Sequence, residues 1–85
     1  MNDAQAPVTA RVGDRLVGGD RRRIGRVDAV FADYLLIRTN GLLPVDLFVP
    51  LAAVSRSSSG VLATEENRAS AYQAWHRPLK RAPHS

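Results

Sequence analysis

The feature that most limits the fold of this chain is residues 18–30, which read GGDRRRIGRVDAV in one-letter code. Two segments of strand character flank a short turn centred on Gly19 and Asp20. Glycine supplies a positive φ at low cost, and an aspartate side chain can accept a hydrogen bond from the backbone two residues on. The segment therefore predicts two antiparallel strands, at about residues 12–18 and 23–31.

The second of these strands departs from strict alternation. Its apolar residues Ile24, Val27 and Val30 are three positions apart, whereas a half-buried strand alternates every two. A β-bulge at Gly25 adds one residue to the strand and switches the side chain that faces the core. We therefore expect Gly25 to be a structural residue, and Gly25→Val to be harmful if the bulge lies there and nearly silent if the strand is regular.

The rest of the chain predicts three more strands and one helix. Residues 34–39 are the strongest strand, and residues 46–49 form another that Pro50 ends because proline lacks an amide hydrogen. Residues 51–54 predict one helical turn, residues 55–60 a loop and residues 61–63 a short fifth strand. Thr64 is the expected N-cap of a helix that runs from about residue 65 to residue 76.

The helix is expected to begin with Glu65 and Glu66, where the helix dipole favours acidic side chains, and to stop before Pro78. One of its faces carries Arg68, Ala71, Tyr72 and Trp75, a stripe that predicts packing rather than a cofactor site. The fold class is thus all-β, a small barrel of five or six strands with one C-terminal α-helix.

With 85 residues, the chain is long enough for one domain. We expect a flexible N-terminal arm at residues 1–10, the folded domain at residues 11–77 and a flexible tail at residues 78–85. The N-terminus lacks the basic start and apolar core of a secretory signal, and no apolar run is long enough to span a bilayer. These observations favour a cytoplasmic protein without a membrane span.

The basic residues are the strongest candidates for function. The formal charge is +4, and eleven of the twelve basic residues are arginine, which binds phosphate and carboxylate with two parallel hydrogen bonds. Arg21, Arg22, Arg23 and Arg26 place four cations at the predicted hairpin. Three interpretations stay open: a solvated turn, contact with an acidic protein, and contact with nucleic acid or anionic lipid. The sequence shows no interleaved aromatics of the kind that stack on bases.

Residues suited to catalysis or metal binding are sparse. The serines cluster at residues 55–59 without a glycine elbow, and His76 and His84 have no acidic partner at ligand spacing. We expect no catalytic residue, no metal, no cofactor and no small-molecule substrate. Self-association is an open possibility, with Leu42, Leu43, Tyr72 and Trp75 as candidate interface residues.

The order of elements resembles the PRC-barrel superfamily, and more closely its small stand-alone bacterial members of unknown function. The resemblance covers about residues 12–75, with departures in the arginine turn and in the Leu42-Leu43 loop. It rests on turn glycines, core aliphatic residues, an acidic segment and a late tryptophan: Gly18, Asp20, Ile24, Gly25, Val27, Val30, Val49, Pro50, Val54, Val61, Leu62, Glu65, Glu66 and Trp75.

PRC-barrel domains act as protein-binding modules in the photosynthetic reaction centre and in ribosome maturation factors, and the barrel itself carries out no chemistry. The resemblance therefore implies a non-catalytic docking module that binds a protein partner, and the apolar candidate interface residues lead us to expect a homo-oligomer. The alternative is an RNA- or ribosome-associated accessory protein that uses the arginine turn on phosphates. Gly18, Asp20, Gly25 and Pro50 are expected to be structural in either case.

Overall fold

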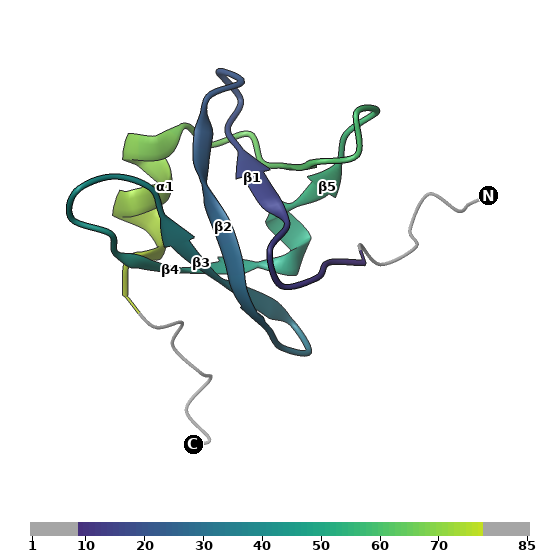
Figure 1. The fold of residues 1–85 in the computed structure, drawn as a ribbon, viewed down its shortest axis with the longest axis horizontal. Helices are drawn as coiled ribbons and strands as arrows, with labels where there is room; N and C mark the ends of the chain where they lie inside the picture. Colours follow the sequence, from purple (N-terminus) through teal and green to yellow (C-terminus); the bar gives the residue numbers. More distant parts are fainter. Residues whose placement is uncertain (1–8, 78–85) are drawn as a thin grey trace.

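The computed structural model describes residues 9–77 (Figure 1). The predicted arm lies mostly, and the predicted tail entirely, outside these residues. The elements along the chain are β1 (Arg15–Val17), β2 (Arg23–Val30), β3 (Tyr34–Thr39), β4 (Asp46–Pro50), the 3₁₀ helix η1 (Leu51–Ala53), β5 (Ser55–Arg56), β6 (Leu62–Ala63) and α1 (Arg68–Trp75).

All six strands form one sheet in the order β4-β3-β2-β1-β6-β5. Neighbouring strands are antiparallel except β1 and β6, which are parallel. The sheet curls into a half-barrel, and α1 contacts β4 beside it (Figure 1). The predicted fold class, a small barrel-like sheet with one C-terminal helix, is confirmed at this level.

The core consists of inward-facing residues of β1, β2, β3, β4 and β6, of Val54 at the end of η1, and of two residues of α1. Side chains two apart in a strand point to the same face, so β3 and β4 send every second residue inward, whereas the irregular β2 sends Ile24 and Val27. The buried hydrophobic residues are Leu16, Ile24, Val27, Leu35, Ile37, Leu47, Val49, Val54, Leu62, Ala71 and Trp75.

The irregular spacing of apolar residues in β2 is explained by extra residues in its ladders, the kind of irregularity that the sequence predicts. Gly25 lies opposite Leu16 of β1, and the next pair joins Arg23 to Val17, so Ile24 is an extra residue in this ladder. A second extra residue, Asp28, interrupts the ladder between β2 and β3. The irregularity predicted at Gly25 is therefore present beside it, and Ile24 and Val27 both face the core.

The predicted start of the helix is wrong. Thr64 is buried in an extended segment, where its amide donates to the carbonyl of Val17 at 3.0 Å, and Glu66 accepts a hydrogen bond from the Gly19 amide at 3.0 Å. These contacts with the first hairpin keep residues 64–66 out of the helix. Asn67 is the N-cap instead, and it forms a reciprocal capping box with Ser70.

Two further predictions need correction at the strand ends. The first strand is shorter than residues 12–18, because residues 11–14 form a turn in which the amide of Asp14 donates to the carbonyl of Arg11. The predicted loop at residues 55–60 contains β5, which pairs with β6. The strand predicted at residues 34–39 and the helical turn near residues 51–54 are confirmed as β3 and η1.

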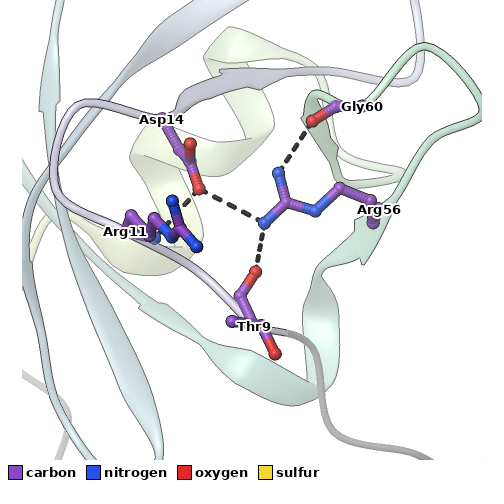
Figure 2. Close-up of polar contacts among 5 residues, drawn as sticks. All are labelled: Thr9, Arg11, Asp14, Arg56 and Gly60. Carbon is purple, nitrogen blue, oxygen red and sulfur yellow. Dashed lines mark hydrogen bonds and ion pairs between the residues drawn. The ribbon is translucent and has the colours of Figure 1, made fainter.

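Arg56 has a structural function at this end of the molecule (Figure 2). Its Nη1 donates to the carbonyl of Gly60 at 2.7 Å, and its Nη2 lies 3.3 Å from Asp14 Oδ2 and donates to the carbonyl of Thr9. The same carboxylate oxygen accepts the amide of Arg11 at 2.9 Å. One arginine thus fastens the segment before β1 to the turn between β5 and β6.

Candidate functional site

A row of three arginines crosses the sheet on the face opposite the core. Arg15 of β1 lies opposite Arg26 of β2, and Arg26 lies opposite Arg38 of β3. Residues directly opposite each other share a face of the sheet, with Cβ atoms about 4.5–5.5 Å apart. We call Arg15, Arg26 and Arg38 the arginine row; all three residues are exposed.

The row is only partly neutralised. Asp46 of β4 lies opposite Arg38, and its Oδ1 is 3.5 Å from Arg38 Nε. Among residues 9–77, the other ion pair joins Arg56 and Asp14 and includes none of the three arginines of the row. Arg15 and Arg26 therefore have no ion-pair partner among residues 9–77, although the exposed Asp28 lies two positions from Arg26 in β2. Like charges directly opposite each other in a sheet are destabilising.

The hairpin arginines predicted from the sequence continue this surface. Arg23 lies opposite Val17, which is two positions along β1 from Arg15, so Arg23 shares the face of the row. Arg21 and Arg22 lie in the exposed turn beyond it. We call the arginine row together with Arg23 the arginine face. Of the four predicted residues, Arg23 and Arg26 lie on this face and the other two at its end.

The turn between β1 and β2 differs from the prediction in one respect. Asp20 Oδ1 accepts the amide of Arg22 at 3.1 Å as expected. The positive φ, however, belongs to Arg21, at 67°, and not to the glycines. Gly18 and Gly19 are required for another reason, because a Cβ would lie 2.6 Å from the Glu66 carbonyl oxygen at Gly18 and 2.5 Å from the Glu65 carbonyl oxygen at Gly19.

Arg21 has a left-handed backbone conformation, which strains any residue with a Cβ but does not strain glycine. The Arg21→Gly variant therefore tests whether this strain lowers the stability of the protein. The left-handed backbone costs a residue with a Cβ about 1–2 kcal/mol, which exceeds the entropy cost of glycine. We expect Arg21→Gly to raise the free energy of unfolding by about 0.5–1 kcal/mol, measured by urea denaturation. Arg22→Gly is the control, since its φ is not positive; an equal gain in both variants would contradict the argument.

The structure also brings together an aromatic cluster, which we define as Phe31, Tyr34 and Phe48. The rings of Phe31 and Tyr34 are stacked, with centroids 4.6 Å apart and 13° between their planes. Phe48 lies 6.2 Å from Tyr34, with its ring tilted by 43°. Sequence reasoning missed this cluster because its members come from a turn and two strands.

The aromatic cluster and the arginine row lie on one face of the sheet. Tyr34, Leu36 and Arg38 are alternate residues of β3, and Phe48 lies opposite Leu36. The alternation of side chains along β3 could have revealed this arrangement from the sequence, because it places Tyr34 and Arg38 on the same face of the sheet. The cluster belongs to the end of β2 and β3 that lies far from the arginine turn (Figure 1).

The candidate interface residues lie in different surroundings. Leu42 is 100% exposed in the loop between β3 and β4, and Leu43 beside it is also exposed. Tyr72 is exposed on α1 and stacks on the His76 ring at 4.3 Å. Trp75 is 9% exposed and packs in the core, which leaves little of its surface for another chain. Self-association through the leucine loop stays a prediction.

A hollow of about 930 Å³ lies between the first hairpin, η1 and the turn before β6. Its lining combines small apolar residues such as Ala52 and Ala63 with Ser57, Ser58 and Ser59. Arg21, Glu65 and Glu66 are its ionisable lining residues. Within the part of the chain that the structure describes, no three His, Asp or Glu residues gather as a metal site requires. His84 lies outside that part.

Pro50 and Gly25, which the sequence predicts to be structural residues, both lie in the sheet. Pro50 is the last residue of β4, opposite Tyr34, and its φ of −61° leads directly into η1. Gly25 is buried where β3 approaches closely.

No helix in residues 9–77 is both long and apolar enough to cross a membrane. No protein-family model matches the sequence, and a search of curated proteins finds no match.

Proposed function

We propose that this protein is a non-catalytic docking module whose arginine face binds an anionic partner. The observation that carries the proposal is the arginine row, in which Arg15, Arg26 and Arg38 lie side by side and only Arg38 has an ion-pair partner among residues 9–77. A row of like charges opposes folding, and a bound anion relieves that repulsion. Each planar guanidinium can also make two parallel hydrogen bonds to carboxylate or phosphate.

The position of the arginines sets them apart from those that stabilise the fold. Arg56 joins three segments of the chain, and Arg68 donates to the carbonyl of Asn40 from the start of α1. Arg15 and Arg26, in contrast, form no ion pair with another side chain of residues 9–77. Charges that contribute nothing to internal packing are the ones free to contact a partner.

The PRC-barrel resemblance supports the same kind of function. A curled antiparallel hairpin with Gly25 at its centre, a strand ending in Pro50 and a late helix with Trp75 in the core are consistent with such a domain. Under this proposal the barrel positions a surface and performs no reaction. Its partner binds to the outer face of β1, β2 and β3, which leaves the core untouched.

The proposal predicts that charge position, rather than net charge, determines binding. Arg26→Gln removes the centre of the row, whereas Arg77→Gln removes one exposed charge beyond α1. We expect Arg26→Gln to weaken binding and to lower the salt dependence of affinity by about one counterion per lost contact. The measurement is fluorescence anisotropy with a single-stranded RNA and, separately, a glutamate-rich peptide over a range of salt concentrations. Equal effects of the two substitutions on both probes would refute the arginine face as the docking surface.

A further inference from the structure

We infer that the partner of the arginine face is a single-stranded nucleic acid, held by its phosphates on the arginine row and by a base on the aromatic cluster. This inference rests on the proposed function and names the chemical class of the partner. It depends on two observations that the sequence does not connect: the row formed by three strands, and the stacked rings of Phe31 and Tyr34 on the same face of the sheet.

The first step is the spacing between the two parts. Tyr34 and Arg38 are four residues apart on one strand, which corresponds to about 14 Å. Leu36 and Phe48 fill the sheet face between them on β3 and β4, and the exposed Asp28 of the neighbouring strand β2 lies two positions from Arg26. A few nucleotides of extended strand cover this length, with a base at one end and phosphates at the other.

The second step is the form of the aromatic cluster. Phe31 is 43% exposed although its ring is parallel to that of Tyr34. Tyr34 also contacts the ring of Phe48, which belongs to β4. The exposed Phe31 ring is thus held by Tyr34, which Phe48 contacts in turn, before a ligand arrives. Such a ring accepts any base, because every base has a π-face.

The third step excludes a duplex as the preferred form. Stacking on a side chain requires an exposed base face, and bases inside a duplex stack on one another. The described helix α1 contributes Ala71 and Trp75 to the core and carries no arginine beyond its first residue. Duplex recognition through a helix in the major groove therefore has no counterpart in residues 9–77.

An acidic peptide would satisfy the arginines but not the exposed ring. Carboxylates pair with guanidinium groups as phosphates do, so Arg26→Gln alone does not separate the two partners. The Phe31 ring does separate them, because a glutamate-rich segment offers it no flat π-system. The aromatic cluster is therefore the feature by which the inference is tested.

The experiment uses the full chain with a fluorescent single-stranded RNA of about ten nucleotides. The same RNA annealed to its complement and a glutamate-rich peptide are the competing probes. We expect Phe31→Ala to weaken binding of the single strand about tenfold, with little change in salt dependence. Tyr72→Ala is the matched control, since Tyr72 is 41% exposed but lies on α1; it should bind like the wild type.

Each other outcome has a defined meaning. If Arg26→Gln weakens binding but Phe31→Ala binds as tightly as the wild type, the docking surface stands and the nucleic-acid inference falls. Tighter binding of the peptide or of the duplex than of the single strand overturns the inference in the same way. If Arg26→Gln and Arg77→Gln behave alike, the proposed function itself fails. Circular dichroism verifies folding, and Phe31→Leu, which keeps apolar bulk without a π-face, replaces Phe31→Ala if the latter unfolds.

Discussion

Replacing Trp75 with alanine is expected to lower the free energy of unfolding by about 3–5 kcal/mol, as removal of a large buried side chain does. The indole is 9% exposed and belongs to the same core cluster as Leu47 and Val49 of β4. Truncation leaves a cavity between α1 and the sheet that the surrounding strands fill only in part. The measurement is equilibrium urea denaturation followed by circular dichroism.

This loss is a large fraction of the free energy of unfolding expected for so small a domain. A folded domain is typically stable by about 5–15 kcal/mol, and a chain of this length is expected near the lower end. Of the described helix, only Ala71 and Trp75 are buried hydrophobic residues, so the indole is the main attachment of α1 to the core. We therefore expect Trp75→Ala to unfold at a much lower urea concentration than the wild type.

Tyr72→Ala provides the control on the same helix. Tyr72 is exposed and packs against the His76 ring, so its removal should cost less than about 1 kcal/mol. The candidate interface assignment of Trp75 makes an opposite prediction. If sedimentation shows that Trp75→Ala loses a dimer while the monomer stays equally stable, the core assignment is contradicted.

The elements of this fold differ in how far the sequence predicts them. The strand β3 could be predicted to the residue, because a run of apolar residues between two turn signals needs no tertiary context. The helix start could not. Thr64 has the chemistry of an N-cap, but its amide is already bound to the carbonyl of Val17 in the sheet. Thr64 and Asn67 both have side chains suited to an N-cap. The hydrogen bond between Thr64 and Val17, which are far apart in sequence, leaves Asn67 as the N-cap.

The arginine row shows the same limit at the candidate site. Clustering in the sequence pointed to Arg21, Arg22, Arg23 and Arg26, yet the row joins Arg26 to residues eleven or twelve positions away. Strand register decides which residues meet, and one extra residue changes the face of every residue that follows. The extra residues Ile24 and Asp28 flank Arg26 in β2, so its outward direction depends on two irregularities, of which the apolar spacing indicated only the one beside Gly25.

The pairing of β2 with β3 depends on Gly25, where the two backbones approach closely. We expect its replacement to lower the free energy of unfolding more than any other single change in the sheet. A Cβ at Gly25 would lie 2.3 Å from the carbonyl oxygen of Arg38 and 2.9 Å from Thr39 Cα. Both are backbone atoms of β3, which cannot move aside as the end of a side chain can. The strands must separate, so we expect Gly25→Ala to cost about 3 kcal/mol or more, and Gly25→Val more again.

Gly13→Ala is the control that separates steric contact with β3 from the strain of placing a Cβ on a backbone with positive φ. Gly13 has a φ of 96° but nothing within 4 Å of its missing Cβ, so its replacement should cost only about 1–2 kcal/mol. Gly25 has no positive φ, and its cost therefore measures contact with β3 alone. Urea denaturation of both variants gives the comparison, and a smaller loss for Gly25→Ala than for Gly13→Ala would contradict the predicted packing. Because Arg26 and Arg38 adjoin this contact, any Gly25→Ala protein that folds should also lose affinity at the arginine face.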